Sequence, residues 1–412
     1  MDYFSDNGKF GTGIIYKLPL YLTVLFPFLL LIGSAVADTA MSMIAVLFIL
    51  RSFLEKDWGW TRELWVRCLA LLWGYMIIRG VFAENPQEAL RRSLPFVRYF
   101  IFASAIACWT LQDAPIRNYF FNVLAAFVLF LAADGMLQWF LGKDILWHPI
   151  LNYDGHFRLT GPFRSEILGI MLAWLSFPVC MRFIMNEEGK LKVGYSTLII
   201  VFIVGVIGLS GERMALLLTL CGWGAAMCIM PVRRVYLLAF FATVLALISL
   251  LAFLSPDFFD RQVFSTLSTL QHWDESPYGK LLNSDLHVAA VNPVFGVGTN
   301  HFRIACKEMY SDPSVCNIHP HNIYMEWLIE QGIIGFSLFI AFIAAIFVKC
   351  FKNWHAVHNN PVFVGLFIAI MMRLWPFSSS TGFFSRWGAP PFWLILGALL
   401  AYLIKVEPKR SL

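Results

Sequence analysis

The chain has 412 residues, of which 59% are hydrophobic and only 14% are charged. A water-soluble domain carries about twice that share of charged residues. The composition therefore excludes a soluble globular protein and indicates an integral membrane protein. The net charge of +5 reflects an uneven distribution of loop charges, described below, and does not indicate a nucleic-acid partner.

Apolar runs of about 20 residues are typical of membrane-spanning helices. About twelve such runs predict an all-α polytopic protein: residues 18–36, 39–54, 65–83, 95–111, 119–141, 165–186, 193–210, 213–230, 234–254, 323–349, 361–376 and 389–405. Between the first two runs, we expect the break at Ala37-Asp38-Thr39. The first run is too long and begins too late for a cleavable signal peptide, so it is the first expected span.

The orientation is predicted from Lys and Arg, which concentrate in cytoplasmic loops. With the N-terminus in the cytoplasm, 17 of the 31 Lys and Arg residues fall on the cytoplasmic side, 11 fall on the outer side and three lie within spans. Four of the outer eleven lie in one long loop, for which the rule carries little weight. We therefore expect both termini in the cytoplasm.

Three outer segments are rich in polar residues, namely 142–164, the tight turn 210–213 and the long loop 255–322. The other connections are mostly short, so we expect one membrane domain over residues 1–412 with one elaborated loop. Most of the histidines lie in these outer segments: His148, His156, His272, His287, His301, His319 and His321. Proton-transfer chemistry is therefore expected on the outer face.

Cys306 and Cys316 are the two cysteines that lie in a loop, whereas the other six lie within or beside spans. An outer compartment that is oxidising favours a disulfide between them. The ring would be short, and its expected role is to shape the loop before His319 and His321. Two free thiols are the alternative.

The segment "GLSGERMALLLTL" places Arg213 at the start of a predicted helix, with Leu217 on the same face. A helix N-terminus that carries an Arg is suited to bind an anion such as a pyrophosphate. The alternative is an interfacial Arg whose side chain reaches back to water.

The segment "RLTGPFRSEILG" contains Arg158, Arg164 and Glu166 around a Gly-Pro turn. We expect the following helix to begin at Pro162 or Ser165, with Glu166 in its first turn, where the helix dipole favours a carboxylate. The two arginines are candidates for substrate binding. Ordinary capping with solvated charges is the alternative.

The segment "CNIHPHNIYMEWLIEQGIIGF" leads from a polar loop directly into an apolar run. Pro320 suits a first helical turn, which would place His321 at the helix start. Asn322, Glu326 and Glu330 are spaced four apart and would line one face of the following span. Histidine serves as a general base near neutral pH, so His321 is the candidate base.

Two further patterns carry less weight. A zinc site would explain the His-x-His pair, but the sequence contains neither Cys-x-x-Cys nor His-Glu-x-x-His, and we expect no metal. The Gly-rich "NPVFGVGTNHF" (292–302) does not match a phosphate-binding loop. We expect it to fix the backbone beneath the histidines.

Together these segments resemble the O-antigen ligase and polymerase superfamily, over residues 150–345. Ligases of this family carry an Arg-x3-Leu motif at a short periplasmic turn, which Arg213 and Leu217 match. They also carry a His-Asn/Ser-x9-Gly motif, which His321, Asn322 and Gly332 match. The resemblance implies a GT-C-like membrane glycosyltransferase of the bacterial inner membrane, with residues 255–322 as a large periplasmic loop and the active site on the periplasmic face.

The resemblance also implies roles for individual residues. Arg213, with Arg158, Arg164 or a cation of the long loop, would bind the pyrophosphate of an undecaprenyl-linked donor, and His321 would activate or orient the acceptor hydroxyl. Glu166, His319, Asn322 and Glu326 would assist in substrate binding. The family's loop arginine has no clear counterpart, and three residues compete for its role: Arg261, Lys280 and Arg303. The lipid donor is already activated, so no cofactor is expected.

Three functions stay open. A ligase would join O-antigen to lipid A–core, and a polymerase would join repeat units that remain on undecaprenyl pyrophosphate. The third function is a transporter with Asp134 and Glu326 on its pathway, but neither internal repeats nor matched broken helices are visible in the sequence.

Overall fold

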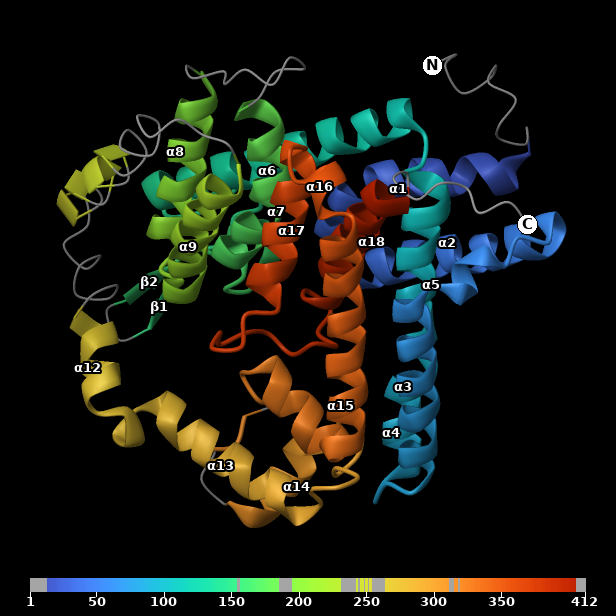
Figure 1. The fold of residues 1–412 in the computed structure, drawn as a ribbon. Coiled ribbons are helices and arrows are strands. Elements are labelled where there is room, and N and C mark those ends of the chain that lie inside the picture. Colours follow the sequence, from blue (N-terminus) through green and yellow to red (C-terminus); the bar gives the residue numbers. More distant parts are fainter. Residues whose placement is uncertain are drawn as a thin grey trace.

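The computed structural model describes residues 13–153, 156–184, 195–230, 264–310, 315–317 and 319–404, with a few short pieces between residues 242 and 253. The described chain is mostly helical (Figure 1). Within the described residues, six helical segments are long and apolar enough to cross a membrane: α1 (Ile14–Ile32), α2 (Ser34–Glu55), α3 (Leu64–Val81), Pro86–Thr110, α6 (Ala114–Leu141) and α15 (Ile323–Lys352).

Five shorter apolar helices match further predicted spans: α7 (Leu168–Ile184), α8 (Tyr195–Leu209), α9 (Arg213–Ile229), α17 (Pro361–Arg373) and α18 (Ala389–Ile404). The predicted span 234–254 lies largely outside the described residues. The helical, polytopic architecture is therefore confirmed in outline. The number of twelve spans and the orientation of the termini stay predictions.

The segment Pro86–Thr110 is a composite of four helical pieces. It consists of α4 (Pro86–Ser93), a 3-10 turn (Leu94–Phe96), α5 (Val97–Ala105) and a π-helical turn (Ile106–Thr110). Asn85 begins it, because its side chain accepts a hydrogen bond from the backbone N–H of Glu88 at 3.1 Å. Pro95 lacks the N–H that a continuous α-helix would need there.

The break between α1 and α2 lies at Gly33 rather than at Ala37-Asp38-Thr39. Gly33 adopts a φ of 153°, whereas the three polar-break residues belong to the first turns of α2. Asp38 is accommodated there because it pairs with Arg98 of α5, with 3.2 Å between Oδ2 and Nη2. The expected position of this turn was therefore wrong by several residues.

Helix α15 is not one straight span, because the backbone breaks at Gly332 (φ 62°, ψ −172°). The ring of Tyr324 lies 6.2 Å from the ring of Phe339, although fifteen residues of helix would separate them by about 22 Å. Residues 323–331 therefore fold back on residues 333–352. The second part alone, about 30 Å long, suffices to cross a membrane.

The Gly-rich segment 292–302 closes this break. Val297 N–H donates to the carbonyl of Ile329, and Ile333 N–H donates to the carbonyl of Pro293, both at 2.9 Å. These bonds satisfy backbone groups that the interrupted helix leaves without partners. A β-carbon on Gly332 would lie only 2.3 Å from the carbonyl oxygen of Val294. The backbone role predicted for this segment agrees with these contacts.

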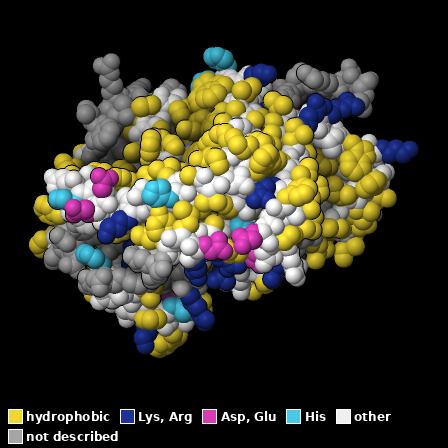
Figure 2. Space-filling model, turned by 90° about the horizontal axis from the view of Figure 1, so that it is seen from below, with side chains coloured by type: hydrophobic (Ala, Val, Ile, Leu, Met, Phe, Trp, Pro, Cys, Tyr) yellow, Lys and Arg dark blue, Asp and Glu magenta, His cyan; other side chains and the backbone are white. Residues whose placement is uncertain are grey.

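The polar segments 142–164 and 255–322 contain their own secondary structure where they are described. Strands β1 (Leu151–Tyr153) and β2 (His156–Arg158) form an antiparallel hairpin. Helices α12 (Ser265–Gln271), α13 (Pro277–Val291) and α14 (Phe302–Met309) of the long loop form a row below the bundle (Figure 1). Seen from below (Figure 2), charged and histidine side chains lie scattered among hydrophobic ones.

Candidate functional site

His319 and His321 lie side by side at the entry to α15, with 4.8 Å between their ring centroids. Nε2 of His321 lies 2.8 Å from the amide nitrogen of Asn317. An amide nitrogen only donates, so Nε2 of His321 accepts and its ring proton lies on Nδ1. Nε2 of His319 is buried and has no hydrogen-bond partner among the described residues.

Both histidines are neutral at neutral pH. Burial lowers the pKa of His321. Burial, followed by the neighbouring His321, lowers the pKa of His319 to about 4, because removal from water disfavours the charged imidazolium. Each ring thus keeps a lone pair that can accept a proton.

The segment 374–388, between α17 and α18, holds the histidines in place. Its Ser380 N–H donates to the carbonyl of His321 at 2.6 Å, and its Phe383 N–H donates to Oε2 of Glu326 at 2.5 Å. A β-carbon on Gly382 would lie 3.1 Å from Oε1 of Glu326 and 3.4 Å from the ring of His319. The sequence predicts only a connection between the spans 361–376 and 389–405 here, so this supporting role was missed.

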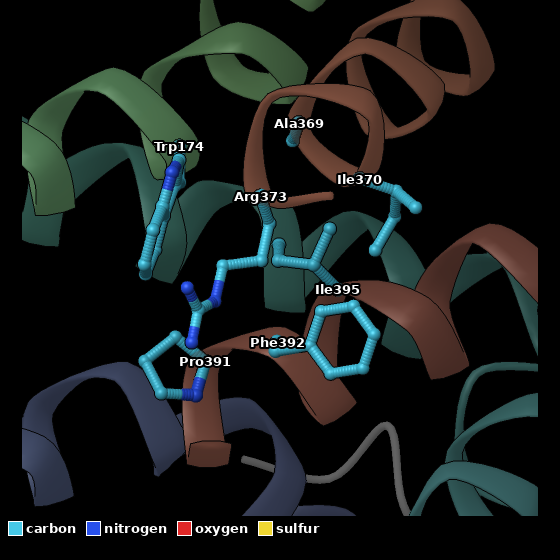
Figure 3. Close-up of a pocket in the computed structure, with 7 residues that line it drawn as sticks. All are labelled: Trp174, Ala369, Ile370, Arg373, Pro391, Phe392 and Ile395. Carbon is cyan, nitrogen blue, oxygen red and sulfur yellow. The ribbon is translucent and has the colours of Figure 1, made fainter. Parts of the chain in front are cut away.

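Arg373, the last residue of α17, contacts this segment and is only 3% exposed. Its Nη2 donates to the carbonyl of Thr381 at 3.1 Å. Its Nε and Nη1 are buried without a hydrogen-bond partner in the described chain. Its guanidinium lies in a small cavity (Figure 3) lined by Trp174, Ala369, Ile370, Pro391, Phe392 and Ile395. Arg373 is therefore a buried cation that sequence reasoning placed simply within a span.

The helix that follows the histidines begins at Ile323, two residues later than expected. Asn322 is its N-cap and accepts hydrogen bonds from the N–H groups of Tyr324 and Met325, at 2.9 and 3.2 Å. Its amide nitrogen donates to the carbonyl of Pro376 at 2.6 Å. Both the oxygen and the nitrogen of the Asn322 amide group are thus hydrogen-bonded to backbone groups.

A second group of polar residues lies at the N-terminal ends of α7 and α9. Oε2 of Glu166 pairs with Nη1 of Arg158 at 2.6 Å. The expectation that Glu166 lies in the first turn of α7 was wrong, because α7 begins at Leu168. Glu212 fills this role instead, since its carboxylate accepts the N–H groups of Gly169 and Ile170 at 2.6 and 3.2 Å.

Burial raises the pKa of Glu212 to about 8. This side chain therefore contributes little negative charge near neutral pH, and the N-terminal ends of α7 and α9 keep an excess of positive charge from their arginines. Such an excess favours an anionic ligand.

Arg213 is the first residue of α9, as predicted. Its Nη1 donates to Oγ of Ser265 in α12 at 3.1 Å, and its guanidinium carbon lies 5.9 Å from the ring centroid of Tyr278 in α13. Arg213 thus connects the membrane bundle to the long loop.

Arg164 lies nearby, on an exposed turn with a left-handed backbone (φ 54°). Its Nε lies 2.7 Å from Nε2 of His148, and Nδ1 of His148 lies 2.7 Å from Oδ2 of Asp144. Asp144 was not singled out from the sequence, and His148 was named only among the histidines of the polar segments, although both belong to the segment 142–164.

Segment 374–388 connects the two groups of residues. The ring of Phe163, beside Arg164, lies 5.4 Å from the ring of Trp387. The same segment contacts His319, His321 and Glu326, as described above. The structure therefore places the histidines and the Gly-Pro turn against different residues of one connecting segment.

The remaining candidates occupy different surroundings. Arg303 pairs with Glu88 of α4 at 2.6 Å, Lys280 is exposed on α13, and Arg261 lies outside the described residues. Cys306 and Cys316 are joined as a disulfide. It belongs to a small apolar cluster with Val288, Phe302 and Ile329.

The comparisons with known proteins agree with the sequence motifs. Residues 198–340 match the family model described as O-antigen ligase. No curated protein matches the chain. The matched range contains both Arg213 and His321, together with Gly332 at the helix break. Over residues 198–340 the chain is therefore similar to the O-antigen ligase and polymerase superfamily.

Proposed function

We propose that the protein is a glycosyltransferase that acts on the periplasmic face of the bacterial inner membrane. It transfers O-antigen glycan from undecaprenyl pyrophosphate to lipid A–core. The observation that carries this proposal is the environment of His321. This residue is half-buried, neutral and held beside His319, directly before the folded-back first part of α15. A neutral imidazole in such a position is suited to accept the proton of a hydroxyl group.

In the proposed reaction the acceptor hydroxyl replaces Asn317 at Nε2 of His321 and gives its proton to that nitrogen. The acceptor oxygen bonds to the anomeric carbon, whose bond to the pyrophosphate oxygen breaks. Undecaprenyl pyrophosphate leaves with the electron pair. Arg213, Arg158 and Arg164 offset the charge on the leaving group. The activated donor drives the reaction, so it requires neither a nucleotide nor a metal.

The polymerase is the second candidate, because it would use the same chemistry with a lipid-linked glycan as acceptor. Its support is the family match, which covers ligase and polymerase-type proteins alike. The transporter is less favoured. Its pathway would include Asp134 of α6. This carboxylate accepts a hydrogen bond from the N–H of Ile145 at 2.8 Å and so fixes the segment that follows α6.

The test is a gel of lipopolysaccharide beside undecaprenyl-linked glycan, from a strain that lacks the gene and carries either the native chain or His321→Ala. Rough lipid A–core with long glycan on undecaprenyl would support the ligase. Core that bears a single repeat, with no long chains, would support the polymerase. Full-length lipopolysaccharide from His321→Ala would contradict both, provided that the variant is expressed at the native level.

A further inference from the structure

Arg164 is held by a pair of residues that the proposed reaction does not yet use. Asp144 is only 4% exposed. It accepts two hydrogen bonds from His148, one from the backbone N–H to Oδ1 at 2.6 Å and one at Oδ2 from Nδ1 at 2.7 Å. His148 in turn contacts Nε of Arg164. The three side chains form a chain from a buried carboxylate to an exposed guanidinium.

The direction of each bond in this chain is fixed by chemistry. An arginine stays protonated in proteins, so its Nε–H only donates. Nε2 of His148 must therefore accept, and the single ring proton must lie on Nδ1, where Asp144 receives it. Asp144 thus selects the tautomer of His148 that accepts from Arg164.

The loop that carries Asp144 and His148 is itself well supported. Gln138 of α6 donates to the carbonyl of His148 at 3.2 Å, and Ile150 N–H donates to the carbonyl of Gly142 at 3.1 Å. A guanidinium held by such a loop keeps a defined orientation. With Nε engaged, Nη1 and Nη2 have no hydrogen-bond partner among the described residues and can bind two oxygens of one phosphate group.

We propose that Asp144 and His148 are positioning residues, which hold the Arg164 guanidinium so that its Nη groups bind the pyrophosphate of the lipid donor. This inference rests on the proposed donor. It assigns to Arg164 the role of a pre-oriented anion ligand, which lowers the entropic cost of binding compared with a freely rotating side chain.

Asp144→Asn tests the inference with little change in shape. The side-chain amide nitrogen that the substitution introduces would face Nδ1 of His148 and donate to it, so the ring proton would move to Nε2. Nε2–H would then face Nε–H of Arg164, and two donors repel each other. We expect the Kd for inorganic pyrophosphate and the KM for the lipid donor to rise about tenfold, the loss typical of a hydrogen bond to a charged group.

A double-mutant cycle distinguishes positioning from a general structural role. The variants are Asp144→Asn, Arg164→Ala and both together, and Asp57→Asn on the exposed loop after α2 is the matched control. If Asp144 acts through Arg164, Asp144→Asn has no further effect on pyrophosphate binding once Arg164 is Ala. Additive losses in the double variant would overturn the inference, as would native binding in Asp144→Asn.

The measurement is pyrophosphate binding to the purified full-length chain in nanodiscs, which requires no glycosyl transfer. If pyrophosphate binding shows the coupling between Asp144 and Arg164 but the native chain makes no glycan product, the proposed reaction is refuted and the anion site is retained. If the native chain transfers glycan but the variants show no coupling between Asp144 and Arg164, the reaction is retained and the positioning role is refuted. Absence of any pyrophosphate binding by the native chain would also overturn the inference.

Discussion

The indole ring of Trp327 stacks on the phenyl ring of Phe339, with 4.7 Å between the ring centroids and 16° between the ring planes. Twelve residues of continuous helix would separate them by about 18 Å. The contact therefore requires the reversal of the chain at Gly332. It also holds the short segment 323–331, and with it Glu326, against residues 333–352 of the same helix.

This reversal gives a physical reason for the Gly of the His-Asn-x9-Gly motif. The backbone of Gly332 lies in a region that is essentially restricted to glycine. It also contacts the backbone of Gly296 so closely that a β-carbon would lie 2.5 Å from Gly296 N. The motif thus joins the candidate base to the turn that positions its helix.

We expect Gly332→Ala to destabilise the protein by about 3 kcal/mol or more, because it combines backbone strain with a backbone clash. Thermal unfolding of the purified chain in nanodiscs measures the loss. Gly74→Ala in α3 is the matched control, since a β-carbon there meets nothing within 4 Å and alanine favours a helix. Equal unfolding temperatures for the two variants would contradict the proposed reversal.

The apolar runs and the two motifs were visible in the sequence because hydrophobicity and short spacings are local properties. The break at Gly332 was not predicted, since the apolar pattern continues through it. The glycine of the His-Asn-x9-Gly motif was the one local sign of this break. Glu212 caps α7 from more than forty residues away, and segment 374–388 reaches His321 across a comparable separation. Such contacts depend on how the helices pack, which composition and periodicity do not specify.

The lowered pKa of His319 predicts a loss of stability in acid. Its pKa is about 4 in the folded chain and about 6.5 in an unfolded chain. Between these values the unfolded chain binds more protons, so the free energy of unfolding falls as the pH decreases from about 6.5 to 4. The loss is complete below the folded pKa.

His319→Gln removes this titration, so the variant should lose less stability than the native chain over the same pH range. Unfolding temperatures measured at several pH values check the prediction. His355→Gln, on the exposed surface of α16 (Trp354–Val357), is the control and should follow the native curve. A His319→Gln curve parallel to the native one would show that His319 is not the responsible group.

Removal of the Cys306–Cys316 disulfide should loosen the end of α14. The two residues are ten apart, and closure of so short a ring stabilises a protein by roughly 2–3 kcal/mol. In the Cys306→Ser/Cys316→Ser variant, we expect faster tryptic cleavage after Lys307, which is exposed beside the bridge. Reductant should accelerate cleavage of the native chain and leave the variant unchanged. Equal cleavage rates without reductant would contradict a stabilising role.

Arg213 provides the sharpest test of the donor site, because its predicted binding of the pyrophosphate can be tested separately from its hydrogen bond to Ser265 of α12. Arg213→Ala removes a cation at the predicted pyrophosphate site, and we expect kcat/KM for the lipid donor to fall about 100-fold or more. Arg213→Lys keeps the charge but loses the planar fork, so an intermediate loss of about tenfold is expected. Ser265→Ala removes only the hydrogen bond between α9 and α12 and should cost about two- to threefold. If Ser265→Ala were as damaging as Arg213→Ala, the function of Arg213 would be to anchor the long loop, and the donor pyrophosphate would bind elsewhere.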